Sequence, residues 1–121
     1  MQISKKKVNP AVKKQVDDLL SKVIADIKNP TEAKEFLKSF LGENEQEALL
    51  RRLGIAYLLT KGKTYSFIKK NLAVSSTTVA SIAKQLDKGK GFKVALSKIA
   101  ADEWADRWAQ KITQMFGKGK K

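Results

Sequence analysis

The hydrophobic positions along the chain recur at three- and four-residue intervals, which predicts helices almost throughout. Asn9 and Pro10 begin the first helix, with asparagine as the N-cap and proline at the first helical position. Its apolar stripe consists of Val12, Val16, Leu19, Leu20, Val23 and Ile27. Asn29 and Pro30 end this helix and begin a second, shorter one. Its apolar face consists of Ala33, Phe36, Leu37, Phe40 and Leu41.

Both stripes are broad for so small a chain, so we expect them to pack against each other, against a third helix and against a second subunit. The third helix is predicted after Gly42, with Asn44 and Glu47 as its capping box and Gly62 as its stop. Gly54 within it costs about 1 kcal/mol relative to alanine. It therefore predicts a close crossing with another helix.

Residues 61–92 predict a short helix, a tight turn and a second helix, with the two-helix reader spanning residues 64–87. Thr64 caps the helix over 65–72, and Ser75 caps the helix from 76 to about 86. The spacing of the apolar positions suits two helices that cross at a steep angle, with one apolar plug in the turn. These positions are Ile68, Leu72, Val74, Val79 and Ile82.

The polar remainder of the second reader helix is predicted to face outward. It consists of Ser76, Thr77, Thr78, Ala80, Ser81, Lys84 and Gln85. Short side chains of this kind let a helix lie deep in a DNA major groove. The alternative is an ordinary helical hairpin with a solvated polar face.

Outside the reader, the sequence predicts a flexible basic arm over residues 1–8, one all-helical domain over 9–116 and a basic tail over 117–121. The arm either touches phosphates or only solubilises the protein. Residues 87–91 are expected to be a flexible, positively charged stop before a last helix over 92–116. Trp104 and Trp108 share one face of that helix, as a core or dimer surface or as a surface for a partner helix. The nearby acidic residues disfavour an anionic membrane surface.

Charge strengthens the nucleic-acid interpretation. The 121 residues carry a formal net charge of +13, and residues 61–98 hold nine lysines against one aspartate. Residues 16–47 hold eight acids against four lysines. Positive potential is therefore concentrated on the predicted reader.

The chain has no cysteine and no histidine, which removes the usual zinc ligands, the commonest general base and the thiol nucleophile. We therefore predict neither an enzyme nor a metal or cofactor site. No apolar run is long enough to span a membrane, and the first ten residues lack the apolar core of a signal peptide. The expected location is the cytoplasm.

The run from Gly42 to Gly62, followed by residues 63–86 and the KGKGF segment, resembles the Trp repressor superfamily, most closely its repressor-like branch without a settled effector. The resemblance covers roughly residues 36–96. It implies an all-α, six-helix intertwined homodimer in which two helix-turn-helix readers project from one shared core. Its DNA-facing positions fall on Lys69, Ser76, Thr77, Thr78 and Ala80. From charge we add Lys61, Lys63, Lys70, Lys84, Lys88 and Lys90.

The residues of the corepressor pocket in the tryptophan-binding members are poorly matched in this sequence. Arg52 matches one arginine of that pocket and is the only candidate for it, but the threonine falls on Gly42. The second arginine falls on Ser81, the adjacent glycine on Ile82 and a ligand-facing serine on Gln85. Because the bulky Ile82 side chain would stand where the indole ring enters in those members, we do not expect L-tryptophan to be the effector.

The sequence therefore predicts a sequence-specific, double-stranded DNA-binding transcriptional regulator, acting as a homodimeric repressor on a pseudo-palindromic operator. Two alternatives remain open at this point. One is an architectural or RNA-binding protein that ignores sequence, for which the net charge is sufficient. The other is an adaptor that docks another protein through the helix containing Trp104 and Trp108.

Overall fold

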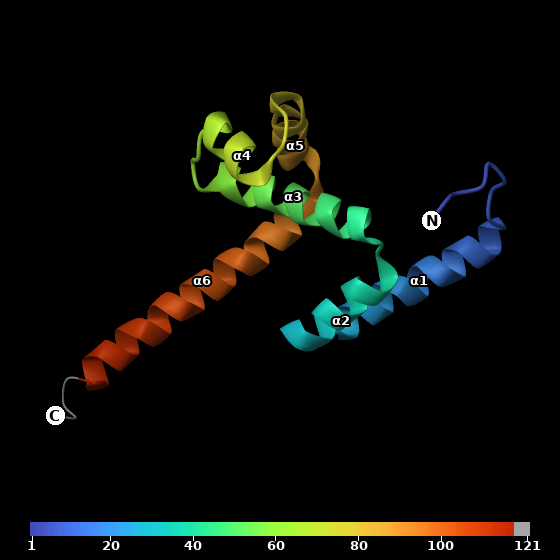
Figure 1. The fold of residues 1–121 in the computed structure, drawn as a ribbon. Coiled ribbons are helices and arrows are strands. Elements are labelled where there is room, and N and C mark those ends of the chain that lie inside the picture. The colour runs from blue at the N-terminus through green and yellow to red at the C-terminus, as the bar shows by residue number, and fades with distance from the viewer. Residues whose placement is uncertain (118–121) are drawn as a thin grey trace. The chain divides into compact units, whose positions relative to one another are not determined.

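The computed structural model describes residues 1–117, which form six helices and no strand. The helices are α1 (Pro10–Asp26), α2 (Pro30–Phe40), α3 (Glu43–Thr60), α4 (Tyr65–Leu72), α5 (Ser76–Lys88) and α6 (Lys90–Gly117), as labelled in Figure 1. The predicted all-α class is confirmed. Of the predicted basic tail, only Gly117, the last residue of α6, lies within the described residues. No helix in the described range is long and apolar enough to cross a membrane.

The chain divides into two compact units, Met1–Ala48 and Leu49–Lys121. The single domain expected over residues 9–116 stays a prediction. In the first unit both predicted caps are confirmed: Asn9 Oδ1 accepts from the N–H groups of Ala11 and Val12, and Asn29 Oδ1 accepts from that of Glu32 at 2.9 Å. Neither α1 nor α2 contains a buried residue. The apolar stripe of α1 is about half exposed from Val12 to Ile24.

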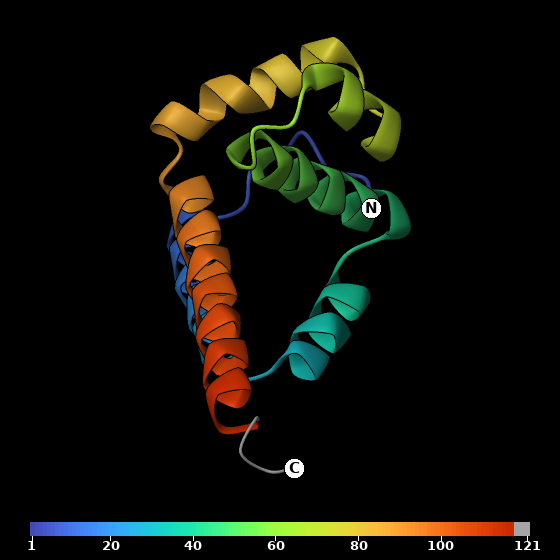
Figure 2. The ribbon, with the colours of Figure 1, turned by 90° about the vertical axis from the view of Figure 1, so that its left-hand side faces the viewer.

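The second unit contains the hydrophobic core. Among its described residues, five side chains are buried: Ile55, Ala56, Ile68, Val79 and Ile82. They come from α3, α4 and α5, which cluster together in both views of the fold (Figures 1 and 2). Phe92 and Leu96 at the start of α6 pack against the same core. The rest of α6 extends away from the cluster (Figure 2).

Gly54 marks a close crossing between α3 and α4, as predicted. A Cβ atom added at this glycine would lie 3.0 Å from Leu72 Cδ1 and 3.3 Å from Leu72 Cδ2. Leu72 is the last residue of α4 and is partly buried against the core. The glycine therefore lets the first reader helix lie directly on α3.

Two predicted boundaries are wrong. The third helix begins at Glu43, and its capping contact runs from the Gly42 N–H to Glu45 Oε1 at 2.7 Å, so Asn44 and Glu47 are not its capping box. The expected flexible stop over residues 87–91 is also absent, because α5 continues to Lys88 and α6 begins at Lys90. Gly89 alone forms the junction, with extended backbone angles of φ −81° and ψ 103°.

Candidate nucleic-acid interface

The angle between the two reader helices is fixed by the core predicted for it. Ile68 of α4 and Val79 of α5 are fully buried, and Ile82 of α5 is 5% exposed. Leu72 and Val74 are partly buried and pack against them. The apolar spacing is therefore confirmed at all five positions, including Val74 as the plug in the turn. Burial of such side chains contributes about 1.5–3 kcal/mol each, which stabilises the angle between the two helices.

The turn between α4 and α5 is closed on each side by a capping hydrogen bond. Ala73 ends α4 in the left-handed conformation, with φ 53° and ψ 53°, and its N–H donates to the Lys69 carbonyl. Ser75 then begins α5, and its Oγ accepts from the Thr78 N–H at 3.1 Å. A left-handed conformation costs a non-glycine residue about 1–2 kcal/mol. The core on both sides of the turn supplies the stability that holds Ala73 there, a feature the sequence did not reveal.

The outer face of α5 carries the side chains predicted to read DNA. All are exposed: Ser76, Thr77, Thr78, Ala80, Ser81, Lys84 and Gln85. The Thr78 hydroxyl lies 3.0 Å from Ser75 Oγ and so belongs to the cap. Thr77 has no side-chain hydrogen bond to any described residue, which leaves its hydroxyl available to a ligand. The first turn of α5 contains no acidic residue, so the positive end of its dipole is unopposed.

The predicted phosphate-contacting lysines fall into two groups. Five are exposed and form no ion pair with the residues that the structure describes: Lys69, Lys70, Lys84, Lys88 and Lys90. Lys63 is exposed too, with its Nζ 5.1 Å from the centre of the Phe67 ring. Lys61 is engaged elsewhere, because its Nζ lies 3.0 Å from Glu103 Oε1.

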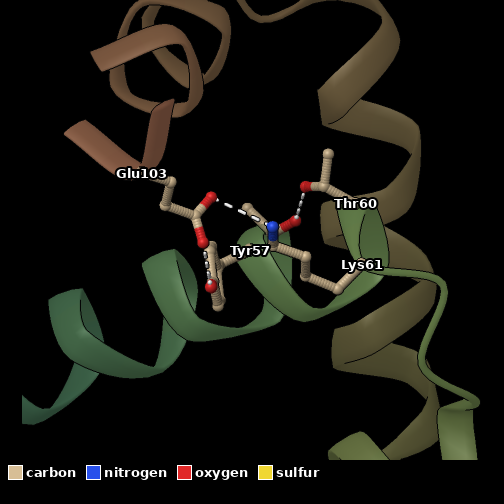
Figure 3. A network of polar contacts seen from close by, with 5 residues as sticks. Tyr57, Thr60, Lys61 and Glu103 are labelled. Atoms are coloured by element: carbon tan, nitrogen blue, oxygen red, sulfur yellow. Dashed lines mark hydrogen bonds and ion pairs between the residues drawn. The ribbon is translucent and has the colours of Figure 1, made fainter. Parts of the chain in front are cut away.

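Glu103 joins α6 to the end of α3 through both of its oxygens (Figure 3). Lys61 Nζ donates to Oε1 and Tyr57 Oη donates to Oε2, each at 3.0 Å. These hydrogen bonds, from Lys61 first and Tyr57 second, lower the pKa of the Glu103 carboxyl below its usual value. Sequence reasoning missed this contact because 42 and 46 residues separate the partners, and no local pattern signals it.

The Glu103 contact predicts a pH dependence of folding stability. A carboxyl whose folded-state pKa is lowered stabilises the fold above its unfolded pKa, and this contribution is lost as the pH falls through the folded value. Glu103→Gln should therefore lose less stability than the natural protein between neutral and acidic pH. Urea unfolding across that range measures it, with Asp102→Asn on the adjacent exposed residue as control. Identical pH profiles for the natural chain and Glu103→Gln would contradict the prediction.

The positions matching the corepressor pocket of the tryptophan-binding members differ in how far they are buried. Arg52, the corepressor candidate, is exposed on α3. Ile82 is buried in the reader core, where it belongs to the cluster of buried side chains from α3, α4 and α5. Gln85 Nε2 donates a long hydrogen bond of 3.5 Å to Ser81 Oγ, and both residues are exposed. Among the described residues no group of three acidic side chains is placed to hold a metal ion.

These features define a class of protein. A buried wedge between two helices, a tight capped turn and an exposed second helix with lysines around it make a helix-turn-helix unit. The family model described as Trp repressor protein matches residues 14–100, well over half of the chain. The chain belongs to the Trp repressor family, whose members are regulatory DNA-binding proteins rather than enzymes. The predicted family is confirmed.

A curated relative also matches most of the chain. The chain is 27% identical over 91 residues to the protein described as "Uncharacterized protein YerC" of Bacillus subtilis (strain 168). The alignment covers 74% of this chain and 86% of the relative. No solved structure matches the chain significantly.

Proposed function

We propose that the protein is a transcriptional repressor that binds a pseudo-palindromic operator in double-stranded DNA as a homodimer. The observation that carries this proposal is the outer face of α5. Its short exposed side chains, held on a helix whose angle the buried core fixes, suit a major groove. Family membership supports the same kind of target. As a regulator of transcription it would act beside the DNA, in the cytoplasm.

The reading face would supply base specificity, and the lysines would supply electrostatic affinity for the DNA backbone. Ser76, Thr77, Thr78 and Ala80 would discriminate between bases. The lysines Lys69, Lys70, Lys84, Lys88 and Lys90, with Lys63, would neutralise phosphates and so supply the dependence of affinity on salt. Lys61 would contribute less than sequence reasoning expected, because it is paired with Glu103.

A homodimer is supported by the apolar surface left uncovered in one chain. Val16, Leu19 and Ile24 of α1 are each about half exposed, and Phe40 of α2 is 70% exposed. Monomeric proteins rarely expose contiguous apolar stripes of this length. Two-fold symmetry then predicts half-sites whose centres are about 34 Å apart, one turn of DNA.

We further propose that L-tryptophan does not control this repressor. The arginine, glycine and serine of the reader helix in the tryptophan-binding members are here Ser81, Ile82 and Gln85. The buried Ile82 side chain would occupy the indole position. Arg52 alone would not define a corepressor site.

Selection from random duplex DNA tests the proposal. We expect enrichment of one pseudo-palindrome with that spacing, at equal strength with and without L-tryptophan. Enrichment of no palindrome would favour the architectural or RNA-binding alternative, for which the net charge of +13 is sufficient. Enrichment that requires tryptophan would contradict the assignment of Ile82 as a block.

A further inference from the structure

The last part of α6 lies beyond the family match. The match ends at residue 100, whereas the helix continues to Gly117. Both views of the fold show this part extending away from the α3–α4–α5 cluster (Figures 1 and 2). The chain has two tryptophans, Trp104 and Trp108, and both belong to this part of α6. The proposed operator contact uses neither of them.

The two indole rings border a shallow hollow of about 390 Å³ on the surface of α6. Trp104 is 58% exposed and Trp108 is 47% exposed. Their ring centres lie 5.7 Å apart and their planes are tilted by 58°, so the rings are not stacked face to face. A flat ligand can therefore lie against an exposed indole face. We call this site the indole hollow, and its lining consists of Trp104, Arg107, Trp108, Gln110, Lys111 and Gln114.

The charges of this part of α6 are segregated around the helix axis. Arg107 and Lys111 border the hollow, are exposed and form no ion pair with the residues that the structure describes. Lys111 Nζ lies 5.8 Å from the centre of an indole ring. At about 100° per residue, Asp102 and Asp106 lie on the side of the helix opposite the indole rings. Glu103 has both oxygens occupied by donors at the end of α3. The hollow therefore presents two cations beside two aromatic rings.

The three kinds of group in the hollow match the three parts of a nucleotide. An indole face suits the flat face of a base, and the guanidinium and ammonium groups suit a phosphate. The amides of Gln110 and Gln114, both exposed, can donate to and accept from the edges of a base. Proteins that bind single strands combine cations along the backbone with aromatic side chains on which bases stack. In a duplex the bases already stack on one another, so their faces are not accessible to the indoles.

We propose that the indole hollow binds single-stranded nucleic acid, with bases stacked on Trp104 and Trp108 and phosphates neutralised by Arg107 and Lys111. A lipid surface matches the hollow less well, because it offers no flat rings and the acids on the other side of α6 disfavour an anionic membrane. An acidic helix of a partner protein offers carboxylates but no flat ring for each indole. The proposal is independent of the operator function, because it uses no residue of the reader.

Tryptophan fluorescence of the full chain tests the proposal. Both tryptophans line the hollow, so the emission reports on this site. We expect saturable quenching by an oligothymidylate of about 12 nucleotides, within the usual range of site sizes. An oligouridylate of equal length in a parallel arm shows whether DNA or RNA binds more tightly. A duplex of equal length should leave the emission unchanged. Quenching by neither single strand, or equal quenching by the duplex, would overturn the proposal.

Two matched double substitutions test the phosphate contacts. Arg107→Gln with Lys111→Gln should weaken binding and make the slope of log affinity against log salt shallower by about 1.4, because each phosphate contact to a single strand contributes about 0.7. Lys93→Gln with Lys98→Gln is the control, since both residues are exposed near the start of α6 and the net charge falls equally. This control should keep the natural slope. Equal slopes in the two double variants would contradict the assigned contacts.

The remaining arms separate this site from other ligands and from the reader. If polyglutamate or phosphatidylglycerol vesicles changed the emission with the affinity of the single strand, the hollow would be a site for acidic protein or lipid and the proposal would be wrong. Thr77→Asp should leave the quenching unchanged. A chain that is quenched but selects no palindrome overturns the operator function alone. A chain that selects a palindrome but is not quenched overturns the single-strand site alone.

Discussion

Thr77→Asp should abolish operator-specific binding and leave the protein folded. Thr77 is exposed in the first turn of α5, and its hydroxyl has no partner among the described residues. A carboxylate there would face the acceptors and phosphates of a major groove, which repel it. The expected loss equals the difference between specific and non-specific affinity, at least about a thousandfold.

The same substitution should not lower the stability of the fold. An acidic residue in the first turn of a helix interacts favourably with the helix dipole, by about 0.3–1 kcal/mol. Fluorescence anisotropy with the selected operator and thermal unfolding would be measured on one preparation. Thr113→Asp on α6 is the matched control, because it makes the same change of charge away from the reader. If Thr77→Asp bound the operator like the natural protein, the assigned reading face would be wrong.

The reader could be predicted from the sequence because local patterns determine it. Asn9, Asn29, Thr64 and Ser75 cap their helices by contacts within three residues. The five apolar positions from Ile68 to Ile82 likewise depend on helical spacing alone. Periodicity therefore predicted both the elements and the face that they bury.

The missed features depend on contacts between distant residues or on backbone detail. Glu103 meets Tyr57 and Lys61 only because α6 folds back against the end of α3. Lys61 is one of the nine lysines of residues 61–98, but a count of lysines contains no information about which of them have acidic partners. Ala73 has a left-handed backbone although the sequence offers no glycine in that turn. The DNA contacts themselves stay predictions, because they depend on a partner as well as on the chain.

The junction between α5 and α6 was mispredicted for a related reason. Two glycines, Gly89 and Gly91, alternate with lysines there, a pattern that is typical of a flexible loop. In the structure only Gly89 lies between helices, and Gly91 is inside α6. The Gly89 N–H donates to the Gln85 carbonyl at 2.6 Å, so the backbone of the junction lies very close to the last turn of α5. A sequence pattern does not distinguish a glycine that loosens a chain from one that allows such an approach.

Gly89→Ala should destabilise the second unit by about 1–3 kcal/mol, the usual cost of an overpacked contact. A Cβ at this position would lie 2.7 Å from the Gln85 carbonyl oxygen and 2.9 Å from Phe92 Cδ2. The oxygen belongs to the backbone of α5, and Phe92 packs against the core. Relief would require the start of α6 to move relative to the reader.

Gly91→Ala is the matched control for this prediction. A Cβ at Gly91 meets no atom within 4 Å, and the residue lies inside a helix, where alanine is favoured over glycine by about 1 kcal/mol. The two substitutions add the same methyl group two residues apart and should shift the denaturation midpoint in urea in opposite directions. Equal shifts would mean that the junction is a loose linker after all. Opposite shifts would establish Gly89 as the residue that fixes the direction in which α6 leaves the reader.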